Sequence, residues 1–205
     1  GVRLVGSEMC IRDRKPIIAI IISLLSCLGL YSQTATEYFN AGDPIKYCGT
    51  EFSLVWSTHP QENYYLQEYL PKGESLDHYN QMFTVSVIFW DRTPREAIQA
   101  KIAELEQRKK TDSVTNYLVV ENNGEYILEF IVSDSNNGKL NTVEVDVHYY
   151  KQMTINGRKA SVLSFYSCRA YGDDIMAFIK SIPDKRKAWY EGMSRLKLNP
   201  KFPNK

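Results

Sequence analysis

Three short turn sequences rich in asparagine and glycine constrain the fold of this chain more than any other feature. They are Asn122-Asn123-Gly124, Asn136-Asn137-Gly138 and Asn156-Gly157, and each follows a run of residues suited to a strand. Tight turns between antiparallel strands need residues with positive φ, a conformation that Asn and Gly tolerate. The three turns therefore predict an antiparallel meander of four strands, over residues 115–121, 125–134, 142–154 and 160–169.

Three more strands are predicted before this meander, over residues 51–57, 64–70 and 82–90, from alternation or from a continuous apolar run. Thr93-Pro94-Arg95-Glu96 combines a capping box with proline at the first helical position, and it predicts a helix that extends to about Lys110. An apolar stripe from Ile175 to Ile182 predicts a second helix. Pro183 is expected to end or kink it before a basic helix over residues 184–197.

The predicted element order is β-β-β-α-β-β-β-β-α. Runs of strands with two segregated helices are typical of the α+β class. We therefore expect an antiparallel β-sheet with two amphipathic helices packed on it.

The N-terminal residues predict export. Met9–Arg14, with the sequence MCIRDR, resembles a translated sequencing adapter from a metagenomic read, so residues 1–14 are interpreted as an artefact. Residues 15–32 are predicted to be a signal peptide, because the apolar run Ile17–Leu30 is shorter than the roughly 20 residues that span a membrane. Its Ser-Gln ending resembles signal peptides of Bacteroidetes-type bacteria.

The predicted location is therefore the periplasm or the cell exterior, with no transmembrane helix in the mature form. Lipid anchoring at Cys27 is the alternative, although Leu24-Leu25-Ser26-Cys27 departs from a typical lipobox.

The remaining chain is predicted to be one domain. Residues 33–49 are polar and irregular and are interpreted as an N-terminal arm, residues 50–198 as a single α+β domain, and residues 199–205 as a frayed tail. Acidic and basic residues are nearly balanced, which argues against a nucleic-acid partner.

Cys48 and Cys168 are the cysteines left after the leader is removed. An even pair in an oxidising compartment predicts a disulfide between the arm and the last strand. The alternative is a pair of buried free thiols.

The stretch Glu68–Val85, EYLPKGESLDHYNQMFTV, resembles a pattern of small exported bacterial proteins in which a Pro-x-Gly turn and a short helix separate two strands. With this element order, the chain resembles PsbP-like α+β proteins. The resemblance implies a binding or accessory module and no catalytic residues.

The strongest candidate for chemistry lies in the strand 142–154. Alternation puts Glu144, Asp146, His148 and Tyr150 on one face, where an acid could orient a histidine base. The simpler interpretation is that the valines between them point into the core and this polar face points to water.

Tyrosines on or beside strands are a further candidate, because tyrosine is enriched at recognition surfaces and is also a good strand residue. The proposed binding residues are Tyr64, Tyr65, Tyr69, Tyr149 and Tyr150. Nucleotide-binding, zinc and nucleophile motifs are missing from the sequence, so no cofactor and no metal site are predicted.

These observations favour a non-catalytic binding or accessory module whose partner is a protein, a glycan or a small molecule. A small hydrolase-like enzyme that uses His148 with Asp146 or Glu144 is the alternative. A third hypothesis is an accessory subunit that docks on a partner through the basic C-terminal helix, with Lys185–Lys187.

Overall fold

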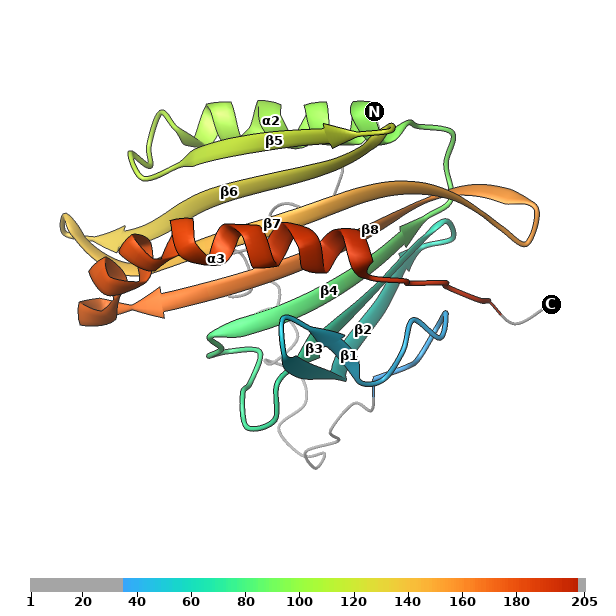
Figure 1. The fold of residues 1–205 in the computed structure, drawn as a ribbon, viewed down its shortest axis with the longest axis horizontal. Coiled ribbons are helices and arrows are strands. Elements are labelled where there is room, and N and C mark those ends of the chain that lie inside the picture. The colour runs from blue at the N-terminus through green and yellow to red at the C-terminus, as the bar shows by residue number, and fades with distance from the viewer. Residues whose placement is uncertain (1–34, 203–205) are drawn as a thin grey trace, which may run out of the picture. The chain divides into compact units, whose positions relative to one another are not determined.

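The computed structural model describes residues 35–202 (Figure 1). Eight strands form one antiparallel sheet with the spatial order β1-β2-β3-β4-β8-β7-β6-β5. The strands are β1 (Ile45–Tyr47), β2 (Thr50–Gln61), β3 (Tyr64–Leu70), β4 (Gln81–Ile88), β5 (Asn116–Asn122), β6 (Glu125–Asn136), β7 (Lys139–Ile155) and β8 (Arg158–Tyr171). The helices are α2 (Pro94–Arg108), α3 (Ile175–Arg195) and the short 3-10 helix η2 (Gly172–Asp174).

The three predicted Asn-Gly turns are confirmed. Asn156 and Gly157 have φ values of 49° and 74°, and Ile155 pairs with Arg158, so the loop between β7 and β8 has only two residues. The other two turns have the same pattern of positive φ. Because such loops are short, β5, β6, β7 and β8 lie side by side in chain order.

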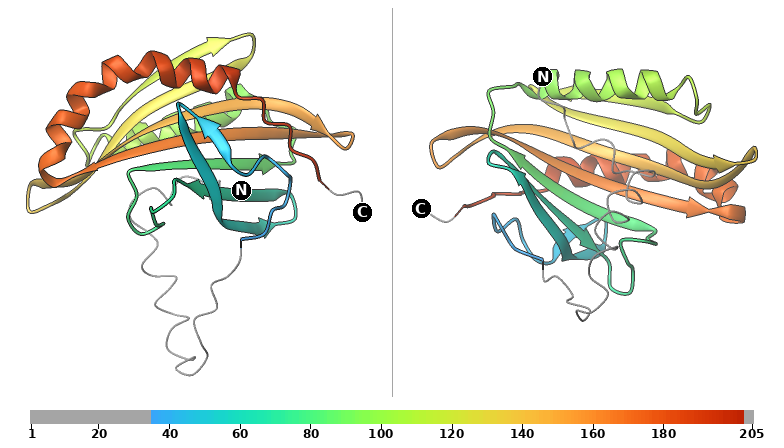
Figure 2. Two further views of the ribbon diagram at one scale, coloured as in Figure 1. Left: turned by 60° about the horizontal axis from the view of Figure 1, so that its bottom comes forward. Right: turned by 180° about the vertical axis from the view of Figure 1, so that it is seen from behind.

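The main hydrophobic core lies between the concave face of the curled sheet and α3 (Figures 1 and 2). Phe52 and Phe83 are fully buried, and their ring centroids are 5.9 Å apart. Trp189 and Met193 bring α3 into the same core. Apolar area removed from water contributes about 25 cal/mol per Å², so burial of these side chains stabilises the fold.

Helix α2 lies on the opposite face of the sheet. Glu129 and Phe130 are consecutive in β6 and therefore point to opposite faces. Arg186 of α3 donates two hydrogen bonds to Glu129, at 2.8 and 2.7 Å. Lys101 of α2 instead lies 5.0 Å from the ring centroid of Phe130.

The start of helix α2 follows from its local sequence. The Thr93 side chain accepts a hydrogen bond from the Glu96 N–H, and the Glu96 carboxylate accepts one from the Thr93 N–H, as the capping box predicts. Helix α3 begins at Ile175 and continues through Pro183 to Arg195. Pro183 therefore does not end α3, because the residues on either side of it pack against the core.

The predicted fold is wrong in its strand order and in its helix packing. Four strands precede α2, so the order is β-β-β-β-α-β-β-β-β-α. The sheet curls into an open half-barrel, and its two helices cover opposite faces. Alternation of apolar and polar residues predicts which residues share a face of a strand. The curvature of the sheet and the placement of the helices depend on long-range packing instead.

The strand that the sequence did not predict is β1, which lies in the predicted arm 33–49. Ile45 and Tyr47 are buried, and the Tyr47 hydroxyl donates to the Trp189 carbonyl at 2.9 Å. Phe39 is also fully buried. Three residues are too few to show alternation, so this segment looks irregular in sequence.

The C-terminal segment also packs against the sheet. The Phe202 ring centroid lies 4.7 Å from that of Tyr65 and 5.2 Å from that of Phe89. The predicted artefact, the signal peptide and Cys27 lie outside the described residues. Within residues 35–202, no helix has the length and apolar character needed to span a membrane.

Candidate functional site

Strand β7 places the predicted catalytic residues on one face, as alternation required. Glu144 and Asp146 are fully buried, and His148 and Tyr150 are 5% and 4% exposed. The interpretation that this face points to water is wrong, because β7 is buried on both faces across residues 143–150.

The two carboxylates are held by cross-strand partners from β8. Arg169 lies opposite Glu144 and forms an ion pair with it, and Ser167 lies opposite Asp146 and donates a hydrogen bond to it. The Tyr79 hydroxyl donates to Glu144 at 3.1 Å. One oxygen of each carboxylate, Glu144 Oε1 and Asp146 Oδ2, has no hydrogen-bond partner among residues 35–202. Burial, and then the nearby Glu144 carboxylate, raise the pKa of Asp146 well above its usual range.

His148 does not form the acid–base pair that a hydrolase would need. Its Nδ1 lies 3.2 Å from the Tyr150 hydroxyl, and its ring packs between Phe130 and Phe165, with centroid distances of 4.7 and 3.9 Å. Burial, and then the positive charge of Lys101, lower the pKa of His148 well below its usual value. The ring therefore behaves as a neutral packing residue, with no hydrogen bond to Asp146 or Glu144 among the described contacts.

The five tyrosines do not form one surface. Tyr65, Tyr69 and Tyr149 pack in or against the concave core. Tyr64 directly precedes Tyr65 in β3, and Tyr150 directly follows Tyr149 in β7. Both therefore point to the opposite face of the sheet. All but Tyr65 are buried, so they do not make a common recognition surface in this structure.

The predicted disulfide between Cys48 and Cys168 is not formed, and both cysteines are free. The Cys48 Sγ contacts the Ala188 carbonyl at 3.5 Å. Burial, and then the nearby Asp146, raise the pKa of the Cys168 thiol to about 12, which disfavours the reactive thiolate.

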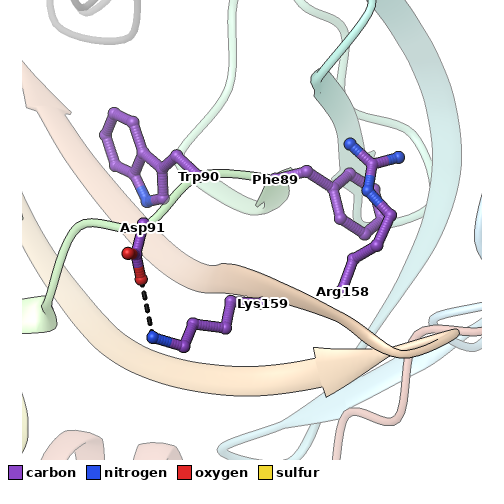
Figure 3. A pocket seen from close by; sticks show the side chains of 5 residues that line it. All are labelled: Phe89, Trp90, Asp91, Arg158 and Lys159. Atoms are coloured by element: carbon purple, nitrogen blue, oxygen red, sulfur yellow. Dashed lines mark hydrogen bonds and ion pairs between the residues drawn. The ribbon is translucent and has the colours of Figure 1, made fainter.

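An open groove lies where β4 ends and β8 begins, and we call it the strand-end groove (Figure 3). Its volume is about 340 Å³. It is lined by Phe89, Trp90, Asp91, Arg158 and Lys159. Aromatic and charged side chains thus meet at one end of the sheet.

Charges in the strand-end groove are only partly neutralised. Lys159 pairs with Asp91 at 2.7 Å, whereas the Arg158 guanidinium lies 4.4 Å from the Phe89 ring centroid (Figure 3). Arg92 lies similarly 5.0 Å from the Trp90 ring centroid. Neither arginine forms a salt bridge within the described residues, so both guanidinium groups are available to bind an anionic ligand.

Hydrogen bonds fix the aromatic residues of the groove. The Trp90 indole donates to Ser161 Oγ at 2.6 Å, and the Phe89 N–H donates to the Asn63 carbonyl at 2.8 Å. Arg158 is held by the preceding two-residue turn. The Trp90 indole and the Phe89 backbone are therefore held by the protein itself, and the two rings point to different sides (Figure 3).

Sequence reasoning missed this groove. The sequence places Phe89 and Trp90 at the end of the predicted strand 82–90, and Arg158 belongs to no recognised motif. The sequence signal that could have indicated the groove is the pair of aromatic residues Phe89-Trp90 directly before the charged pair Asp91-Arg92. Only the pairing of β4 with β8 brings these residues to the second set, at Arg158 and Lys159.

A family model matches residues 39–198, a range that contains all eight strands and both α-helices. No curated protein and no solved structure matches the chain. The family is uncharacterised, and the PsbP-like resemblance stays a prediction. Because the matched range covers more than half of the 205 residues, the chain belongs to this family.

Proposed function

We propose that this chain is an exported, non-catalytic binding module that holds a small anionic ligand with an apolar part in the strand-end groove. The carrying observation is the Arg158 guanidinium, which lies over the Phe89 ring with no salt bridge among the described residues. A guanidinium fork binds carboxylate or phosphate with two parallel hydrogen bonds.

The groove suits a ligand with both a charge and a flat or apolar body. Phe89 and Trp90 offer aromatic surface and Arg158 offers positive charge, while Arg92 lies next to the lining, over the Trp90 ring. Its volume of about 340 Å³ lies at the lower end of the size range of small-molecule sites. This argues for a small ligand rather than a long peptide.

Two observations favour binding over the hydrolase alternative. His148 is buried between aromatic rings and forms no hydrogen bond to a carboxylate among the described contacts. Asp91 and Lys159, the carboxylate and the amine that line the groove, form an ion pair with each other at 2.7 Å, so neither is a free nucleophile or base.

Export is proposed from sequence alone. The apolar run Ile17–Leu30 after Lys15 has the anatomy of a signal peptide, and Cys27 offers lipid anchoring as the alternative. The PsbP-like resemblance of Glu68–Val85 also implies a binding or accessory role.

Calorimetric titration with benzoate and with inorganic phosphate tests the ligand class. We expect benzoate to bind the wild-type chain more tightly than phosphate, because only benzoate can also pack against an aromatic ring of the groove. Arg158→Ala should weaken benzoate binding by about tenfold, which corresponds to the loss of a charge-assisted contact.

Lys72→Ala is the matched control, since it removes an exposed positive charge from the turn after β3. It should leave benzoate affinity unchanged. The proposal fails if wild type binds neither anion, or if Arg158→Ala binds benzoate as wild type does.

A further inference from the structure

Strand β5 forms an open edge of the sheet. It pairs with β6 on one side, and no strand within residues 35–202 pairs with its other side. Its outward backbone N–H and C=O groups therefore present a row of donors and acceptors to any strand that approaches.

The side chains of this edge are unusually apolar. Leu118, Val119 and Val120 are 45%, 43% and 40% exposed. They are three of the five large hydrophobic residues that are exposed in the described part of the chain. Edge strands usually carry lysine, proline or a bulge that prevents pairing, and β5 has none of these.

The residues of β5 are chemically compatible with an antiparallel copy of the same strand. In a two-fold antiparallel pairing centred on Val119, that residue faces its own copy and Leu118 faces Val120. Tyr117 then faces Glu121, and Asn116 faces Asn122. Apolar residues meet apolar ones, and no like charges lie opposite each other.

We propose that β5 pairs antiparallel with β5 of a second copy of this chain, which joins two sheets into one continuous sheet. A two-fold axis uses the same surface on both copies, and this requires the self-complementary pattern found around Val119. Leu118 and Val120 of both copies then form one apolar cluster on the face that carries α3, because they alternate with Val119.

Molar mass in solution tests the pairing. Light scattering after size exclusion should give a dimer for the full chain at high concentration. Val119→Lys should raise the dimer dissociation constant at least about tenfold, since it places two positive charges opposite each other. Met176→Lys, at an exposed position of α3, is the matched control and should leave the mass unchanged.

Cysteine cross-linking tests the register separately. Directly opposed Cα atoms in an antiparallel pair are about 4.5–5.5 Å apart, within the range that a disulfide spans. Under mild oxidation Val119→Cys should form a covalent dimer well above the level of the unsubstituted chain, while Met176→Cys should not. A monomeric wild type, a dimer unaffected by Val119→Lys, or equal cross-linking of both cysteine variants would each overturn the proposal.

Discussion

The two faces of β7 are equally buried but have opposite chemistry. Val143, Val145 and Val147 point into the concave core and are at most 1% exposed. Glu144 and Asp146, which alternate with them, are fully buried on the other face. One strand thus carries buried valines on one face and buried carboxylates on the other.

The two faces contribute to stability by different rules. Apolar burial contributes roughly in proportion to area and needs no specific partner. A buried charge is tolerated only when a counter-charge and hydrogen bonds compensate for its lost hydration. The concave face should therefore respond to changes in volume, and the polar face to changes in partners and in pH.

The largest expected effect is on the concave face. Phe83→Ala removes a fully buried ring that packs 5.4 Å from the Tyr47 ring centroid and 5.9 Å from that of Phe52. The free energy of unfolding should fall by about 3–5 kcal/mol. Urea denaturation measures it, with exposed Met176→Ala as a control that should change it by less than about 0.5 kcal/mol. Equal losses in both variants would contradict the comparison.

Removing the main cation of the polar face should have the next largest effect. Arg169→Met leaves the buried Glu144 carboxylate without its ion-pair partner, at a cost of about 3 kcal/mol. Combining it with Glu144→Gln should recover most of this loss in a double-mutant cycle. If the double variant is as unstable as Arg169→Met alone, the loss comes from packing and not from the unpaired charge.

His148 should make stability depend on pH. Burial lowers its pKa in the folded state, so below the unfolded value of about 6.5 the unfolded chain binds more protons. Stability contributed by His148 is therefore complete above that pH and is lost as pH falls, by up to about 1.4 kcal/mol per pH unit. Urea denaturation at pH 7.5 and 5.5 should show a smaller loss for His148→Gln than for wild type. An identical pH dependence would refute this role.

Asp146 should act in the opposite pH direction and more weakly. Its pKa is raised in the folded state, so the folded chain binds more protons above the unfolded value of about 3.9. Stability contributed by Asp146 is complete below that pH and is lost as pH rises through the folded-state pKa. Asp146→Asn should therefore stabilise the protein by about 1 kcal/mol at pH 8 and less at pH 4. Thermal unfolding at both pH values measures this, and destabilisation at pH 8 would contradict it.

Much of the local structure could be predicted because its signals are local. The strand at 64–70 matches β3, and the capping box starts α2 at Pro94 as expected. By contrast, β1 has three residues, and β2 continues to Gln61, beyond the predicted end of the strand at residue 57. The extent of these strands depends on pairing with a neighbouring strand, and the local sequence does not show that pairing.

The candidate sites show the same limit. Alternation correctly placed Glu144, Asp146 and His148 on one face, but it gave the wrong environment for that face. Trp90 and Arg158 both line the strand-end groove. Only the pairing of β4 with β8 brings them to the same end of the sheet.

The sequence by itself determined the turns, the helix starts and which residues of a strand share a face, because each depends on φ preferences, capping or a period of two residues. Only the tertiary structure decided that both faces of β7 are buried and that aromatic and basic residues meet at the strand-end groove. Burial depends on what covers a face, and α2, α3 and the curled sheet come from distant parts of the chain.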